Sequence, residues 1–226
     1  MSGHIGPVVQ KSTPGMIADK LRAAIGHREL KPGEQLLEAE LARQLGVSRG
    51  PLREGMQRLT QEGLLVAIRN RGLFVLDMAP EDIRDMYLAR EAIERAAARL
   101  VVSGDFAAAG DALLAVVDEM GRARTSAAMS ELDVAFHELL VALSGSPRLR
   151  RMHQTFITET RMCIHLLDDS YAKSDFREEE HRMLAAAIRA GDAELTDRLL
   201  VAHMDDGLAR LVEAPGAEAV EEVVVL

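Results

Sequence analysis

The sequence lacks several residue types that would otherwise point to common protein classes. It contains one cysteine, Cys163, so it can form neither an internal disulfide nor a zinc site built from several cysteines. It contains no tryptophan, and aromatic residues make up 3% of its 226 residues. Leu, Ala, Val and Met must therefore pack the core, and the apolar share of 48% is enough to build one. Such a core favours helices over a β-sandwich.

Long apolar runs are also missing. The chain has no stretch of 18 apolar residues that could cross a bilayer. Its N-terminus lacks the basic-then-apolar order of a signal peptide. We therefore expect a soluble, cytoplasmic protein with no membrane partner.

Positive charge is scarce overall, since the formal net charge is −9, but it is unevenly distributed. Residues 1–78 hold 11 Lys/Arg against 8 Asp/Glu, a net of +3, and the remainder holds 16 against 28, a net of −12. A mildly basic head followed by an acidic body is typical of a DNA-binding domain joined to a second domain.

The head is organised around residues 38–63, which predict two helices joined by a tight turn. Leu41 and Leu45 recur at helical spacing on the first helix. Gly46 suits the positive φ of a helix C-terminus, and Ser48 is a good N-cap for the second helix. This pattern indicates a helix-turn-helix.

The second helix combines an apolar inner side with a basic outer side. Its outward first turns carry Ser48, Arg49 and Arg53, a hydroxyl and two guanidiniums that suit phosphates and base edges. A solvated arginine face on an ordinary helix pair is the alternative. Two short apolar runs then flank an Asn/Gly turn and predict a β-hairpin wing with Arg69 and Arg71 at its tip.

These patterns predict a mainly α protein. A flexible N-terminus covers residues 1–13, a winged helix-turn-helix covers 14–76 and a linker covers 77–80. An all-α antiparallel bundle covers 81–213 and a tail covers 214–226, for which we have no interpretation. Glycine, proline and serine breaks place six helices in the bundle, at about 81–103, 106–122, 126–144, 147–169, 174–190 and 192–213.

Four residues of the bundle have the character of metal ligands. Asp133 and His137 are four apart and share a helix face, and His181 and His203 lie in the last two helices among apolar neighbours. Side chains from three helices can converge in a bundle core and bind a divalent metal, with zinc as the first candidate and nickel, manganese or iron as alternatives. A structural, hydrogen-bonded role is the alternative for each histidine. The other four are interpreted as surface or packing residues, although His165 could line a cavity; they are His4, His27, His153 and His165.

Arg90 and Glu94 form an i,i+4 pair on the first bundle helix. One interpretation is a surface salt bridge. The other is an arginine that points into a pocket and binds the carboxylate of an acid.

With these motifs the sequence resembles transcription regulators of the GntR family, FadR-type branch, with an FCD effector-binding domain. The resemblance covers roughly residues 14–213. In the head it rests on residues 30–33, 45–49, 51–54 and 71–75, and in the body on Asp133-x-x-Phe136-His137, Glu180-His181, residues 187–188, residues 191–192 and His203.

The resemblance implies a homodimer that binds a palindromic double-stranded DNA operator and, in its bundle, a small organic acid. It implies DNA contacts at Ser48, Arg49, Gly50, Arg53 and the wing residue Gly72. It implies metal ligands at Asp133, His137, His181 and His203, and an effector-binding role for Arg90.

Two departures from the family pattern affect the DNA contacts. Many relatives carry arginine where this chain has Ala39, and Gly50 replaces a commoner residue. Operator sequence therefore cannot be transferred from relatives. Three rival hypotheses remain at this point: a metal-dependent enzyme, a regulator whose signal is the metal itself, and a regulator in which the four polar residues contact an acid without metal.

Overall fold

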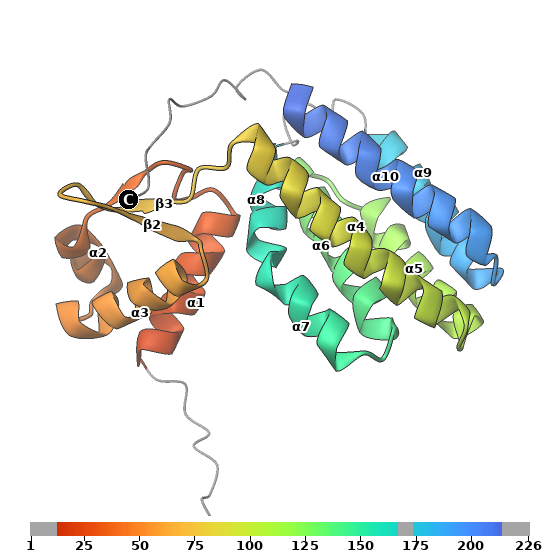
Figure 1. The fold of residues 1–226 in the computed structure, drawn as a ribbon, viewed down its shortest axis with the longest axis horizontal. Coiled ribbons are helices and arrows are strands. Elements are labelled where there is room, and N and C mark those ends of the chain that lie inside the picture. Colours follow the sequence, from red (N-terminus) through yellow and green to blue (C-terminus); the bar gives the residue numbers. More distant parts are fainter. Residues whose placement is uncertain (1–12, 167–173, 214–226) are drawn as a thin grey trace, which may run out of the picture. The chain divides into compact units, whose positions relative to one another are not determined.

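The computed structural model describes residues 13–166 and 174–213. The chain divides into two compact units between Asp77 and Met78, each described here by itself (Figure 1). None of the helices in the described ranges has the length and apolar character that a membrane span needs. Two expected segments lie outside the described residues: the N-terminal segment 1–13, except for its last residue, and the tail 214–226.

The first unit is a three-helix winged helix-turn-helix. Its elements are α1 (Thr13–Gly26), β1 (Gln35–Leu36), α2 (Glu38–Leu45), α3 (Arg49–Gln61), β2 (Leu65–Ile68) and β3 (Gly72–Val75). Helix α1 packs on α3 through buried Ile17, Leu21 and Ile25. The two helices meet at Gly55, where a Cβ would lie 2.9 Å from Cγ2 of Ile17, so a larger residue there would push them apart.

The predicted hairpin is present, and a third strand joins it. β2 and β3 pair antiparallel, with Leu65 opposite Val75 and Ile68 opposite Gly72. β1 pairs with the other edge of β3, giving the order β1-β3-β2. The sequence does not predict β1, because two residues are too few to show a strand periodicity.

The second unit contains seven described helices rather than the six expected. They are α4 (Pro80–Val102), α5 (Phe106–Met120), α6 (Ser126–Leu143), α7 (Pro147–Thr155), α8 (Ile157–Leu166), α9 (Ser174–Arg189) and α10 (Ala193–Glu213). The single helix predicted for residues 147–169 was wrong: it breaks at Phe156, whose φ of −118° is not helical, and its residues 167–169 lie outside the described ranges. The Thr155 hydroxyl donates to the carbonyl of Met152 at 2.7 Å, a local bond that competes with helix continuation.

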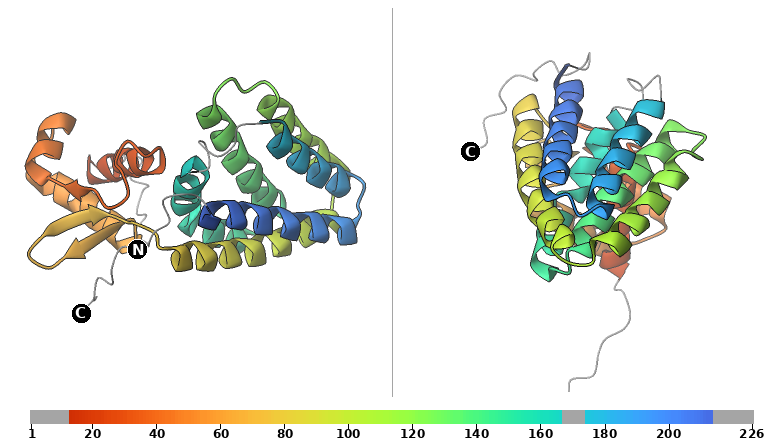
Figure 2. Two further views of the ribbon diagram at one scale, coloured as in Figure 1. Left: turned by 90° about the horizontal axis from the view of Figure 1, so that it is seen from above. Right: turned by 90° about the vertical axis from the view of Figure 1, so that its right-hand side faces the viewer.

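The helices of the second unit surround one apolar core. α4 and α10 lie side by side (Figure 2), and Arg95 of α4 donates to both carboxylate oxygens of Asp197 on α10, at 2.6 and 2.8 Å. α5 packs on α9 at Gly110, where a Cβ would lie 2.5 Å from Cα of Arg189. This contact requires glycine, because a side chain would overlap the backbone of α9. The apolar core contains fully buried side chains from α5, α6, α9 and α10; they include Leu113, Phe136, Leu140, Leu184, Ile188 and Leu200.

Candidate DNA-reading surface and metal centre

The turn between α2 and α3 has the backbone geometry that the sequence predicts. Gly46 lies in the left-handed region, with φ 66° and ψ 33°, and its N–H bonds to carbonyls at the end of α2. Leu52, Met56 and Leu59 of α3 are fully buried. The opposite side of α3 is therefore left to solvent.

That solvent side carries the predicted DNA-contacting residues. Ser48, Arg49 and Gly50 are exposed at the N-terminus of α3. Ser48 stands at the N-cap position, but its hydroxyl makes no capping hydrogen bond, which corrects the capping role expected for it. Arg53 is also exposed and donates from Nε to Glu38 of α2 at 2.7 Å. The start of α3 thus presents backbone N–H groups, a hydroxyl and guanidiniums on one face.

The wing presents two further arginines. Arg69 and Arg71 are exposed at the β2–β3 turn, and the turn uses positive φ at Asn70 (61°) and Gly72 (108°). Gln35 of β1 donates to the carbonyl of Arg71, and the Arg71 guanidinium lies 5.3 Å from the Phe74 ring centroid. The tip is therefore braced by β1 while its charges face solvent.

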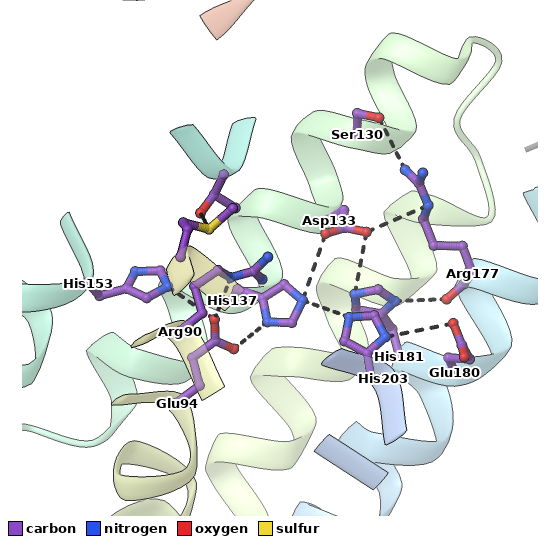
Figure 3. Close-up of polar contacts among 12 residues, drawn as sticks. Arg90, Glu94, Ser130, Asp133, His137, His153, Arg177, Glu180, His181 and His203 are labelled. Carbon is purple, nitrogen blue, oxygen red and sulfur yellow. Dashed lines mark hydrogen bonds and ion pairs between the residues drawn. The ribbon is translucent and has the colours of Figure 1, made fainter. Parts of the chain in front are cut away.

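In the second unit, three of the four predicted ligands come together from three helices. One ring nitrogen each of His137 on α6, His181 on α9 and His203 on α10 lies within 4.8 Å of the others (Figure 3). The Nε2 atoms of His137 and His203 are 3.1 Å apart. Asp133, one turn before His137, places its carboxylate oxygens 3.8 Å from Nε2 of His137 and 3.8 Å from Nε2 of His181.

His181 supplies the observation that tests whether a metal fits. Its Nδ1–H donates to the backbone carbonyl of Arg177 at 2.8 Å, which leaves the lone pair on Nε2. That Nε2 is buried and has no hydrogen-bond partner among the described residues. Burial lowers the pKa of His181 to about 3, against the opposing effect of Asp133, so the ring is neutral at pH 7. An orphaned imidazole lone pair that faces two further histidines and a carboxylate fits a divalent cation.

Asp133 is held ready as an anion. Burial alone would raise its pKa, but its interactions with His181 and Arg177 outweigh burial and set the pKa at about 2. Nε of Arg177 lies 3.6 Å from Asp133, and its guanidinium donates to the hydroxyl of Ser130 at 3.1 Å. Arg177 was not among the residues predicted for this site, although its position four residues before His181 places it on the same face of α9.

Arg90 and Glu94 form a buried pair, so the surface interpretation of them was wrong. Their side chains are 2% and 0% exposed, and Nε of Arg90 donates to Glu94 at 3.2 Å. Burial lowers the pKa of Arg90, but Glu94 and neighbouring acidic groups reverse this and raise it overall. Burial would raise the pKa of Glu94, yet its interactions with His137 and Arg90 hold it well below its usual value. His153, expected to be a surface or packing residue, is buried and bonds to Glu94 at 3.3 Å.

The remaining histidines and the cysteine take no part in this cluster as far as the structure describes them. His27 is exposed in the first unit. His4 and the side chain of His165 lie outside the described residues, so the suggestion that His165 lines a cavity stays untested. Cys163 is buried, and burial raises the pKa of its thiol to about 12.

Comparison with known proteins identifies a domain family in each of the two units. The family model for bacterial regulatory proteins of the gntR family matches residues 13–75, and the model for the FCD domain matches residues 85–206. The crystal structure of a transcriptional regulator GntR from Rhodococcus sp. RHA1 superposes with a TM-score of 0.79 at 28% identity, covering 91% of this chain and 100% of that one.

Curated relatives align over most of their length. The uncharacterized HTH-type transcriptional regulator YdhC of Bacillus subtilis (strain 168) is 27% identical over 205 residues, covering 87% of this chain and 91% of YdhC. The HTH-type transcriptional repressor GlaR of Escherichia coli (strain K12) is 24% identical over 198 residues, covering 77% of this chain and 84% of GlaR. The chain belongs to the GntR family of bacterial transcriptional regulators, with an FCD domain after its DNA-binding domain, and is not an enzyme.

Proposed function

We propose that this regulator is a ligand-responsive repressor that binds a palindromic operator as a homodimer. In this proposal its FCD domain holds a divalent metal ion within a pocket for a small organic acid. The observation that supports the pocket most directly is the convergence of three imidazoles and Asp133, with the buried Nε2 of His181 left without a hydrogen-bond partner. Operator binding also implies a cytoplasmic location.

The DNA-binding half of the proposal assigns a role to each exposed group of α3 and the wing. Arg49 and Arg53 read base edges or phosphates, and the free hydroxyl of Ser48 contacts a phosphate. Gly50 leaves open space where a Cβ would stand, which lets the DNA backbone approach the helix. Arg69, Arg71 and Gly72 bring the wing to the adjacent groove.

The metal half assigns Asp133, His137, His181 and His203 as ligands. Three imidazole nitrogens and one carboxylate suit zinc, and nickel, manganese or iron are alternatives. The bound cation would supply a Lewis-acidic centre for carboxylate oxygens. Arg90 would then hold the effector's carboxylate: only Nε is engaged with Glu94, and no other hydrogen bond of its guanidinium is found among the described residues.

Regulation in this proposal requires the effector to bind one arrangement of the dimer better than another. DNA affinity then changes by no more than the effector's differential affinity for the two states. Repression is the direction we propose, because a relative that aligns over most of the chain, GlaR, is named a transcriptional repressor.

Metal content tests the pocket directly. We would purify the protein without a histidine tag or added metal and measure metals by mass spectrometry, beside the double variant His181→Ala/His203→Ala and the control His27→Ala. About one metal per subunit in the parent and the control, and almost none in the double variant, is the expected result. A parent that stays empty after reloading with zinc, nickel or manganese would sink the metal assignment.

Two versions of the regulator differ in the role of the metal. If the metal itself is the signal, a chelator alone will change operator affinity in a fluorescence-anisotropy titration. If an acid binds the polar residues without metal, its effect on operator affinity will survive chelation. Under the proposal made here, chelation abolishes the acid's effect.

A further inference from the structure

Glu94 is a carboxylate that the proposed function does not use, although it lies between the two parts of the proposed pocket. It is fully buried in α4, beside the buried side chain of Ile93, and one turn after Arg90. A buried carboxylate without partners is strongly unfavourable, so the groups that bind it must be in place whenever the unit is folded. Three such groups are present (Figure 3).

The first group is the ring of His137. Nδ1 of His137 lies 2.5 Å from Oε2 of Glu94. Because an ionised carboxylate only accepts hydrogen bonds, the ring proton must sit on Nδ1. The lone pair of neutral His137 is then on Nε2, the atom that lies 3.1 Å from Nε2 of His203 and 3.8 Å from Asp133.

The other two groups engage the second oxygen. Oε1 of Glu94 accepts from Nε of Arg90 at 3.2 Å and from Nε2 of His153 at 3.3 Å. His153 belongs to α7 and Arg90 to α4, so the carboxylate is held by contacts to α4, α6 and α7 together. These contacts hold Oε1 while Oε2 is bonded to His137.

A purely structural Arg90–Glu94 ion pair would need one carboxylate oxygen and would leave the tautomer of His137 undetermined. Here each oxygen has a separate task. We propose that Glu94 is the positioning residue that fixes His137 as a metal ligand and, through its other oxygen, aligns Arg90 for the effector, so that one carboxylate couples the two. This inference rests on the proposed metal site and extends it.

The test begins with the parent protein free of metal. Long-range 1H–15N correlation spectra of the imidazole rings report the tautomer of each histidine, and His137→Gln identifies the His137 signal. A proton on Nδ1 of His137 is expected. A proton on Nε2 of His137 would overturn the proposal.

The second measurement is zinc affinity in competition with a chromophoric chelator. Glu94→Gln keeps the size of the side chain but removes the charge and leaves one acceptor for three donors. Loss of an outer carboxylate partner weakens metal binding by about 10–100-fold, and we expect that loss here. The matched control is Glu91→Gln on the same helix, whose carboxylate pairs with Arg95 instead; its affinity should match the parent.

The outcomes separate the inference from the proposed function. If the parent binds no zinc, both the proposed metal site and this inference are refuted. If the parent binds zinc and Glu94→Gln binds it equally well, the metal site stands and the positioning role is refuted. Weakened binding in Glu94→Gln alone, with the Nδ1–H tautomer in the parent, supports the proposal.

Discussion

Replacing His181 with leucine should separate two effects of the metal site: its destabilisation of the metal-free fold and the stabilisation of the fold by a bound metal ion. In the metal-free protein the buried Nε2 of His181 has no hydrogen-bond partner, and such an atom costs about 1–3 kcal/mol. Leucine removes that cost and buries an apolar side chain. Leucine also deletes the hydrogen bond from Nδ1–H to the carbonyl of Arg177, which stabilises the fold by about 0.5–1.5 kcal/mol. It further deletes the edge contact with Phe136, whose ring centroid lies 4.7 Å from that of His181, a loss of about 0.5–1.5 kcal/mol. The metal-free variant should therefore be as stable as the parent or more stable.

Zinc should reverse this order. At a free concentration 100 times Kd, zinc stabilises the folded parent by about 2.7 kcal/mol. For a unit of this size, about 2–4 °C of Tm corresponds to each kcal/mol, so the parent should gain about 5–11 °C in thermal unfolding. His181→Leu should gain almost nothing, because it lacks one of the three imidazoles.

A second buried histidine provides the control. His153→Leu makes the same chemical change where the ring nitrogen is already bonded to Glu94, so metal-free His153→Leu should lose about 1–3 kcal/mol. Equal destabilisation of the two leucine variants in a chelator would refute the reasoning about the unpaired nitrogen. A zinc-induced rise in Tm of His181→Leu equal to that of the parent would refute its role as a ligand.

Three further predictions concern other parts of the chain. Arg49→Ala and Arg53→Ala should each weaken specific operator binding by about 1–3 kcal/mol in fluorescence anisotropy. Arg58→Ala, at the other end of the same helix, is the control and should have a much smaller effect. Unchanged operator affinity in the first two variants would refute the assignment of α3 as the recognition helix. Gly110→Ala should lower Tm, since overlap with the backbone of α9 costs about 1–3 kcal/mol and exceeds the gain of up to about 1 kcal/mol from helix propensity. The Cys163 thiol, with its pKa raised to about 12, should not react with a disulfide reagent at pH 8 until the protein is unfolded, and rapid reaction of the native protein would contradict its burial.

The sequence predicted the parts of the structure that depend on local rules. Gly46, the apolar spacing of α3 and the Asn/Gly turn of the wing each specify a local conformation through neighbours a few residues away. The same holds for the pairing of Asp133 with His137 on one helix face. The apolar neighbours of the last two histidines indicated that these could converge on this pair, and the family resemblance strengthened that expectation.

What the sequence did not predict depends on contacts between distant segments. Glu94 meets His137 across 43 residues and His153 across 59, and no periodicity records such a meeting. His153 is buried three residues before the break at Phe156, and the sequence did not predict that break. The two-residue strand β1 is formed by antiparallel pairing with the edge of β3, a contact between distant segments.

The chain distance between the histidines has a consequence for unfolding. His137 and His203 lie 66 residues apart, and in the absence of a cation the apolar core and the contact between their Nε2 atoms join their helices. An ion bound by both would act as a removable cross-link, so that α10 could not detach from α6 without first breaking a coordination bond. Resistance of the C-terminal helix to limited proteolysis would then report metal occupancy in a cell extract, with no need to know the effector or the operator.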